Sequence, residues 1–426
     1  MLRRRARAPS IARDNRTTPI RFDLGNIGRA LAHRPYRIYT IGNATSLIGT
    51  WMQRVAIGWL AWELTGSGAW LGLIAFSDLF PTVVLSPLAG TLADRHERVA
   101  IILVTQALAA VQAMTLAALT WTGAITIWSL VTLSLLMGVL NAFAQPARLA
   151  LISRLVTGAS LGTAVALNSV VFNLARFIGP MCAGYIIAHG GTALAFACNA
   201  ASFVAFIAAL TQMPRDPAIA ARARSHVLGE AIAGYAYVAR HKALGPLFAF
   251  YAITAILGRG FVELLPGFAD AVFNRGPQGL AWLTGATGLG AMAGGLWMAH
   301  RPSTKGLTRL IVGNVLVMSA ALIGFVSTRH FGIAFCCLLV AGFSLVVNGI
   351  GAQTLVQHAA APHMRGRIMA TYGMIFRGGP AVGALVMGTL SSHIGLQLAV
   401  GSGAVLCALS WLWTRRLRKS MAQALE

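Results

Sequence analysis

The sequence contains 426 residues, of which 57% are hydrophobic and only 11% are charged. This composition excludes an ordinary soluble domain, since soluble chains carry about 25% charged residues. The formal net charge is +23, but the basic residues gather between long apolar stretches, so no nucleic-acid partner is expected.

Twelve long apolar segments follow one another along the chain. A helix that crosses a bilayer needs about 20 mostly apolar residues, and these segments are apolar on all sides instead of alternating as membrane β-strands do. We therefore predict an all-α integral membrane fold with twelve transmembrane helices surrounded by the lipid bilayer. The predicted spans are 36–62, 68–92, 98–120, 126–147, 161–188, 192–212, 245–271, 279–299, 307–327, 331–357, 364–390 and 394–414.

The connecting segments differ in basic content, which predicts the orientation of the chain. Segments on one side carry most of the arginines, among them Arg95 and Arg98, whereas those on the other side carry only Arg275 and Arg329. By the positive-inside rule the basic side is cytoplasmic, and an even number of spans places both termini there. The Arg-rich first 35 residues also have features of a transit peptide, but their acidic residues favour a cytoplasmic tail.

A charged segment with two prolines separates the first six predicted spans from the last six. Its later part, from His226 to Arg240, has the pattern of an amphipathic helix that lies on a membrane surface. The predicted organisation is a basic cytoplasmic tail over 1–35, an N-terminal six-helix bundle over 36–212, a cytoplasmic linker over 213–244, a C-terminal six-helix bundle over 245–414 and a cytoplasmic tail over 415–426.

The two halves share a local pattern. Arg176 precedes Gly179-Pro180 in the fifth predicted span, and Arg377 precedes Gly379-Pro380 in the eleventh. Equivalent spans of the two halves therefore carry an arginine just before a Gly-Pro pair. This internal symmetry is typical of transporters built from parallel repeats and predicts two pseudo-symmetric bundles.

The loop between the second and third predicted spans reads GTLADRHER from Gly90 to Arg98. It resembles the GxLaDrxGrkxxl signature of the major facilitator superfamily, which occupies the same place in that family, although Glu97 stands where glycine is usual. The resemblance implies a cytoplasmic gate in which Gly90, Asp94, Arg95 and Arg98 tie helix ends together in the outward-facing state. A capped, charged loop at a membrane surface is the alternative.

Three longer stretches narrow the resemblance. They are NAFAQPARLALISRLV, LGTAVALNSVVFNLARFIGP and QTLVQHAAAPHMRGRIMATYGMIFRGGPAVGAL. They look like the branch of the superfamily that contains the enterobactin exporter and the macrolide efflux proteins. The resemblance, which extends from about Arg34 to Trp413, implies alternating-access transport in a bacterial inner (cytoplasmic) membrane. Gly179-Pro180 with Gly184 also approximates the fifth-helix GPxxGG pattern of proton-coupled antiporters, which favours export.

Ionisable groups inside the bilayer are costly and usually face a bundle interior or a water-filled cavity. The candidates for such groups in the predicted spans are Arg54, Asp78, Arg176, Arg259, Glu263, Asp270 and Arg377. Arg259, Glu263 and Asp270 are spaced to share one helical face, on which Arg259 and Glu263 would pair either as a functional site or as a structural lock. Asp78 has no basic neighbour in its own span and is the leading proton-responsive acid. The candidates for proton coupling are Asp78, Glu263, Asp270, Arg54 and Arg259.

Prolines accompany these charges. A proline removes the hydrogen bond to the carbonyl four residues earlier, and Pro81, Pro180, Pro266 and Pro380 each free a carbonyl at or beside a buried charge. Such polarity is tolerated where backbone lines a cavity, although kinked structural helices are the alternative. The candidate hinges are Pro81, Gly179, Pro180, Pro266, Gly379 and Pro380, and the candidate substrate cavity consists of Arg176, Arg377, Asn173 and Asn168.

The predicted function is export of a small molecule by proton-coupled antiport, energised by the proton gradient without a bound cofactor. Four buried arginines against three acids favour an anionic cargo such as an enterobactin-like siderophore, with macrolide or multidrug efflux as the alternative. A receptor or scaffold that transports nothing is the alternative from a different class. No enzyme or metal site is predicted, since the five cysteines lie within spans without metal-ligand spacing, and the chain is expected to act as a monomer.

Overall fold

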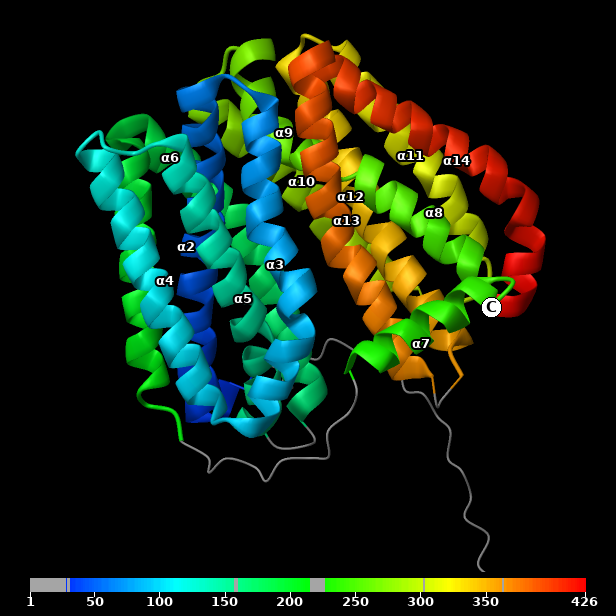
Figure 1. Ribbon diagram of the computed structural model, residues 1–426, viewed down its shortest axis with the longest axis horizontal. Helices are drawn as coiled ribbons and strands as arrows, with labels where there is room; N and C mark the ends of the chain where they lie inside the picture. Colours follow the sequence, from blue (N-terminus) through cyan, green and yellow to red (C-terminus); the bar gives the residue numbers. More distant parts are fainter. Residues whose placement is uncertain (1–27, 29–30, 157–159, 215–226, 302, 362–363) are drawn as a thin grey trace, which may run out of the picture.

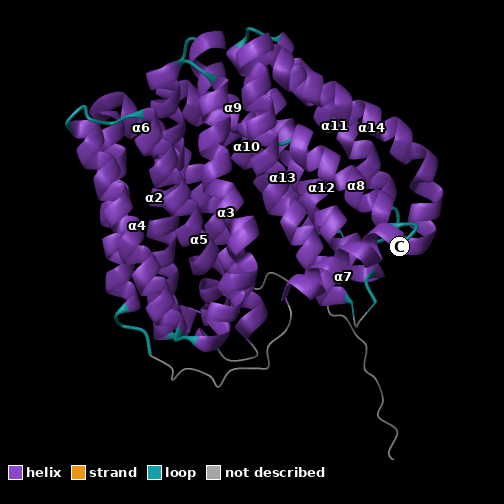
Figure 2. Ribbon diagram, viewed as in Figure 1, coloured by secondary structure: helices purple, strands orange, loops and turns teal. Residues whose placement is uncertain are grey.

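The computed structural model describes residue 28 and residues 31–156, 160–214, 227–301, 303–361 and 364–426. In these residues the regular structure is helical, and short loops join the helices (Figure 2). This follows from the apolar composition, because in a bilayer a helix satisfies every backbone hydrogen bond within its own segment. The elements are α2 (Arg34–Thr65), α3 (Gly68–Arg95), α4 (Arg98–Trp121), α5 (Ile127–Leu155), α6 (Leu161–Leu210), α7 (Val227–Arg240), α8 (Leu244–Leu257), α9 (Phe261–Gly267), the π-helical turn η2 (Phe268–Val272), α10 (Gly276–Ala299), α11 (Leu307–Ser327), α12 (Phe331–Ala359), α13 (Arg365–Ile394) and α14 (Leu396–Leu425).

The 50-residue helix α6 contains two spans that fold back on each other. At Gly191 the backbone leaves the helical region, with φ 75° and ψ 175°, a conformation that essentially only glycine adopts. The hydroxyl of Tyr36 donates a 3.0 Å hydrogen bond to the carbonyl of Ala164, and a Cβ on Gly42 would lie 2.7 Å from the Cβ of Ala209. Both ends of α6 thus lie beside the same end of α2, and the chain reverses at Gly191.

The predicted all-α membrane fold is confirmed in the described part of the chain. Nine helical segments there are long and apolar enough to cross a membrane. This number counts α6 as one segment and treats the stretch from α8 to η2 as one segment. The reversal in α6 divides one of them into two spans. Helices α2 and α10 have 32 and 24 residues and pack among the others, although they fall outside those nine, so the count of twelve spans stays a prediction.

The helices form two bundles, α2 to α6 and α8 to α14 (Figure 1). We call the end that carries the α3–α4 loop at His96 the motif end, and the opposite end, where α2 ends at Thr65, the far end. The motif end is lowest in Figure 1, where α7 also lies. The ribbons of the two bundles approach each other at the far end and diverge toward the motif end.

Glycines allow the close approach at the far end. Helices α3 and α13 touch backbone to backbone, since a Cβ on Gly72 would lie 2.3 Å from the carbonyl oxygen of Ala384 and one on Gly388 would lie 2.5 Å from the carbonyl oxygen of Gly68. Toward the motif end, Gly90 of α3 and Gly373 of α13 have no atom of a neighbouring element within 4 Å of a Cβ position. The bundles are therefore closed at the far end and separate toward the motif end.

The equivalent pair α6 and α10 repeats this packing. A Cβ on Gly184 of α6 would lie 2.4 Å from the Cβ of Ala281 in α10. In the internal packing of the halves, a Cβ on Gly179 would lie 2.5 Å from the Cβ of Trp51, and a Cβ on Gly379 would lie 2.6 Å from the Cβ of Ala255. The two Gly-Pro segments thus make equivalent contacts in the two halves.

The end of α14 differs from the predicted one. Helix α14 continues to Leu425 and does not end at 414, so the segment predicted as a tail is helical. The carboxylate of the next residue, Glu426, accepts hydrogen bonds from the backbone N–H groups of Gly306 and Thr308 at 2.5 and 2.6 Å, which caps the start of α11. Helix α7 occupies the region of the predicted amphipathic helix and buries Gly234 and Val238, one turn apart, on one face.

We predict that Gly72→Val weakens the contact between the bundles and that Gly373→Val does not. Both changes place a β-branched residue in a helix, but only the first meets a facing backbone. Overpacking costs about 1–3 kcal/mol, so Gly72→Val should lower the temperature at which the purified protein in detergent loses its monodisperse peak. Equal temperatures for the two variants would contradict the packing described above.

Candidate transport site

Arg54 of α2 lies between two acidic side chains, one from each bundle. Its Nη2 donates a 2.7 Å hydrogen bond to Oε1 of Glu263 in α9, and its Nη1 lies 3.4 Å from Oδ2 of Asp78 in α3. The side chains of Arg54, Asp78 and Glu263 are 31%, 22% and 19% exposed, so water reaches them. Arg54 thus pairs with Asp78 from a neighbouring helix, and Glu263 joins the same cluster, which we call the Arg54 cluster.

Further contacts between α2 and the seventh span close the far side of this cluster. One helical turn beyond the arginine, a Cβ on Gly58 would lie 3.3 Å from Cγ of Pro266. Another turn further, Cζ3 of Trp62 would lie 2.8 Å from a Cβ on Gly267, and Nε1 of Trp62 donates a 2.9 Å hydrogen bond to Oδ2 of Asp270. We call this row of contacts the α2–α9 seam. Because the seam closes the far end, we infer that the exposed sides of the Arg54 cluster face the motif end.

The seventh span does not form the continuous charged face predicted from the spacing of its residues. Helix α8 ends at Leu257 and α9 begins at Phe261, so Arg259 lies in a break between two glycines. The i, i+4 geometry that would pair it with Glu263 requires an unbroken helix. Asp270 lies in the π-helical turn η2 and binds Trp62. Glu263 therefore pairs across the bundles, and the three charged residues have separate partners.

Arg259 lies against aromatic side chains of the C-terminal bundle. Its guanidinium carbon is 5.2 Å from the ring centre of Phe376, a distance typical of a cation–π contact. Tyr372 stacks on Tyr251 with 5.1 Å between ring centres, and its hydroxyl donates a 2.8 Å hydrogen bond to the carbonyl of Gly349. This half of the site thus combines one cation with a stack of rings.

Arg176 and Arg377, which are equivalent in the sequence, have different surroundings. The guanidinium of Arg176 lies 5.7 Å from the ring centre of Trp51, and Arg54 lies at the same distance from that ring. Nη1 of Arg377 donates a 3.3 Å hydrogen bond to Oγ of Ser86, which joins α13 to α3 across the bundles. Arg176 therefore belongs beside the Arg54 cluster, whereas Arg377 is nearer to the motif end.

The two candidate asparagines contribute differently. Nδ2 of Asn173 donates a 2.8 Å hydrogen bond to the carbonyl of Ser169 on its own helix. Asn168 is half-buried one turn earlier in α6. Neither is bonded to Arg176 or Arg377, and their role in binding a cargo stays a prediction.

The family model for transmembrane secretion effectors matches residues 29–426. The chain belongs to this family of the major facilitator superfamily. Among its relatives, the staphyloferrin A transporter of Staphylococcus aureus is 23% identical over 353 residues, which covers 82% of this chain and 87% of that protein. The enterobactin exporter of Shigella flexneri is 24% identical over 408 residues, or 93% and 97% of the two chains. Macrolide efflux protein A of Streptococcus pyogenes is 22% identical over 368 residues, or 85% and 91%.

A solved structure shows the same fold. A bacterial homologue of the human lysosomal transporter Spinster, in an inward-facing and unoccupied conformation, aligns with a TM-score of 0.70 and 13% identity. The alignment covers 95% of this chain and 99% of that chain. The predicted superfamily is therefore confirmed, and the chain is a multi-pass membrane protein related to bacterial transporters.

The gate motif of this major facilitator chain lies at the ends of two helices. Arg95 is exposed in the last turn of α3, and Arg98 is half-buried at the first residue of α4. Gly90 faces open space, and the side chain of Asp94 lies outside the described residues. The predicted gate contact is not formed by the described side chains, and its role in another conformation stays a prediction.

The hinge prolines lie inside helices. Pro81 is in α3, Pro180 in α6, Pro266 in α9 and Pro380 in α13. The interruption of the seventh span occurs at Gly258 to Gly260, upstream of Pro266. Gly179 and Gly379 serve the close packing of the halves. Whether the prolines act as hinges stays a prediction.

Sequence reasoning missed a network of buried amides in the N-terminal bundle. Nε2 of Gln53 donates a 3.0 Å hydrogen bond to Oε1 of Gln112, and Nδ2 of Asn199 donates a 2.8 Å hydrogen bond to Oε1 of Gln53. All three are at most 2% exposed. Amides inside predicted spans are a signal comparable to charge because they hydrogen-bond across helices, but the sequence prediction includes only Asn168 and Asn173 among them. This network holds α2, which carries Arg54, against α4 and α6.

We predict that Arg54→Gln and Glu263→Gln are coupled in stability, because each removes the same charged hydrogen bond. Such bonds contribute about 1.5–3 kcal/mol, so the double variant should be less destabilised than the sum of the two single variants by an amount of this order. Thermal inactivation in detergent measures the cycle. As a matched control, the destabilisations caused by Arg259→Gln and Glu263→Gln should add up in the double variant. If these two variants are coupled instead, Arg259 and Glu263 pair with each other as the sequence predicts.

Proposed function

We propose that this chain exports an anionic small molecule across a bacterial inner membrane in exchange for protons. The family is one of membrane transporters, and relatives along most of the chain are named as an exporter and an efflux protein. The observation that supports this proposal best is Arg54, whose guanidinium is shared between the bundles and is open to water from the motif end. Under the positive-inside rule the motif end is cytoplasmic, so the conformation described here accepts cargo from inside the cell.

Charge counting supports proton coupling at the Arg54 cluster. One guanidinium cannot neutralise two carboxylates, so the cluster carries one net negative charge when Asp78 and Glu263 are both ionised. One bound proton makes it neutral. Because a net charge held away from bulk water is costly, proton binding and conformation are linked in such a cluster.

The same pairing suggests a cycle of alternating access. With Glu263 ionised, its bond to Arg54 helps the α2–α9 seam to keep the far end closed in the empty carrier. An anionic cargo that pairs with Arg54 releases Glu263 and allows the far end to open. A proton from the outer side then neutralises the exposed Glu263, so that the emptied carrier can return. Release of that proton to the inner side restores the bond between Arg54 and Glu263 and completes the cycle.

An anionic cargo is supported by the side chains around the cluster. Arg54 and Arg176 flank the indole of Trp51, and Arg259 lies on the ring stack of the other bundle. Planar guanidinium groups bind carboxylate and phenolate oxygens well, and aromatic rings provide apolar contact. Two relatives are named for siderophores, staphyloferrin A and enterobactin, so we infer a siderophore as the leading cargo. Macrolide efflux is the second candidate, supported by the named macrolide relative.

We predict that Asp78→Asn and Glu263→Gln impair proton-driven transport. Everted membrane vesicles with an acidic interior should take up enterobactin or a macrolide through the wild-type protein, depending on the true cargo. At least one of the two variants should lose this response to the proton gradient while it still binds the cargo. Asp270→Asn is the matched control, because this acid bonds Trp62 outside the Arg54 cluster, and it should keep proton coupling.

Full proton coupling in both Asp78→Asn and Glu263→Gln would show that these acids do not carry the proton. Binding of a cargo without transport by purified protein in liposomes would favour a receptor. Transport in the opposite direction would identify an importer.

We also predict that Arg176→Ala and Arg377→Ala weaken the binding of an anionic cargo. Loss of a charged hydrogen bond of about 1.5 kcal/mol raises the apparent Kd about tenfold. Cargo binding to purified protein measures the effect, and Arg329→Ala, an exposed arginine at the far end, serves as control. Unchanged transport in both variants would mean that these arginines mark only kinked helices.

A further inference from the structure

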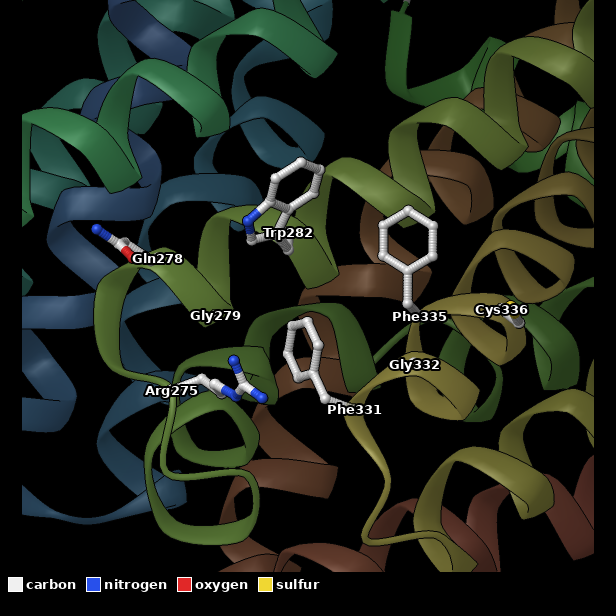
Figure 3. Close-up of a pocket in the computed structure, with 8 residues that line it drawn as sticks. All are labelled: Arg275, Gln278, Gly279, Trp282, Phe331, Gly332, Phe335 and Cys336. Carbon is white, nitrogen blue, oxygen red and sulfur yellow. The ribbon is translucent and has the colours of Figure 1, made fainter.

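A separate cavity of about 460 Å³ lies at the far end of the C-terminal bundle, between the first turns of α10 and α12. Figure 3 shows its walls: the ring of Trp282 from α10 and the rings of Phe331 and Phe335 from α12 surround the space, and the guanidinium of Arg275 points toward it. None of these residues belongs to the Arg54 cluster or to the α2–α9 seam. The cavity therefore has its own chemistry, with one cation at one end and aromatic walls.

The position of Arg275 is fixed by its surroundings. Its backbone N–H donates a 2.8 Å hydrogen bond to the carbonyl of Ala269, and its carbonyl accepts one of 3.0 Å from Gly279. A Cβ at Gly279 would lie 2.4 Å from the Cβ of Arg275. The absence of a side chain at this glycine therefore leaves room for the aliphatic part of Arg275 beside the first turn of α10. The guanidinium then lies 5.4 Å from the ring centre of Phe331.

This cation has no acidic partner. Among the described residues, the ion pairs of 4.0 Å or less involve Arg54 and not Arg275. The guanidinium of Arg275 contacts the Phe331 ring, and its backbone bonds other backbone groups. A guanidinium that stacks on a ring keeps its N–H donors free at the edge. An oxyanion in the cavity can accept them.

The other end of the cavity faces the bilayer. Trp282 is 52% exposed and Leu296, four turns along the same face of α10, is 50% exposed, while Ile333 beside the cavity in α12 is 52% exposed. Large apolar side chains exposed on spanning helices face lipid, and tryptophan is enriched at the level of the headgroups. From Arg275 to Trp282 the helix rises about 10 Å. The site thus presents a cation at the helix ends and an apolar wall deeper in the membrane.

We propose that this cavity binds an anionic phospholipid, with the phosphate on Arg275 and the upper acyl chain along Trp282 and Phe335. The cation at the helix ends and the apolar wall deeper in the membrane match the headgroup and the acyl chains of a lipid that enters from the bilayer. A soluble anion would not contact the aromatic wall. A cavity of this size suits part of a ligand and holds the headgroup region, with the remaining chains in the bilayer. The lipid ties α10 to α12 at the far end, independently of cargo and proton.

Native mass spectrometry of the detergent-purified protein tests this assignment. Phosphatidylglycerol, phosphatidylcholine and inorganic phosphate are titrated separately onto the wild-type protein, Arg275→Gln and Arg329→Gln. We expect a phosphatidylglycerol adduct on the wild-type protein and on Arg329→Gln, which loses a far-end arginine outside the cavity. In Arg275→Gln the apparent affinity should fall about tenfold, the loss expected for one charged hydrogen bond. Trp282→Ala should also weaken the adduct, because the acyl chain loses its wall.

Three results would overturn the proposal. Retention of the phosphatidylglycerol adduct by Arg275→Gln would place the lipid elsewhere. Equal binding of phosphatidylcholine would show that the anionic charge is not recognised. Arg275-dependent binding of inorganic phosphate as tight as that of the lipid would make the cavity a soluble-anion site. Gly279→Ala serves as a second variant that leaves the charge in place and displaces the arginine stem, and it should weaken the lipid adduct like Arg275→Gln.

Discussion

The hydrogen bond between Arg54 and Glu263 is the interaction on which the arrangement of the two bundles depends. It joins α2 to α9 at 2.7 Å, next to the far-end contacts of the α2–α9 seam. On its far side the seam consists of close contacts of Gly58 and Gly267 and of the indole of Trp62, which donates a hydrogen bond to Asp270. The side chains of the Arg54 cluster themselves are partly exposed. The pair therefore stands at the boundary between a tightly packed region and an open one, where its strength is sensitive to small movements.

The packed region requires that helix backbones approach closely, and glycine allows this because it has no side chain. Gly68, Gly72 and Gly388 bring α3 and α13 into backbone contact, which large side chains would prevent. Such interfaces have little interdigitation, so helices can slide or tilt on one another with few side-chain rearrangements. The charged pair supplies the specificity that a smooth glycine interface lacks. A carrier that must open and close at the same interface benefits from this division between smooth packing and one strong polar contact.

Much of the fold follows from sequence patterns, whereas the site follows only in part. The apolar segments predict the helices well, because backbone in a bilayer has few alternatives to a helix, and the Gly-Pro repeat predicts the equivalence of the halves. The acids and Arg54 were found because charge inside an apolar segment is rare. The pairing of Glu263 with Arg54 was not predicted, since it depends on which helices meet and on the break at Arg259, where two glycines remove the face that spacing predicts. The buried amides and the cavity at Arg275 arise from tertiary contacts between distant segments, on which local spacing gives no information.

The reversal of α6 at Gly191 decides more than the shape of one helix. As a continuous rod, its 50 residues would measure about 75 Å, more than twice the roughly 30 Å thickness of the hydrocarbon core. The chain turns back without a loop, at one residue whose φ of 75° favours glycine. The direction of every later helix depends on this turn. Without it the chain would cross the membrane one time fewer, and each later helix would run in the opposite direction. A single backbone torsion thus sets which way the entire second bundle faces.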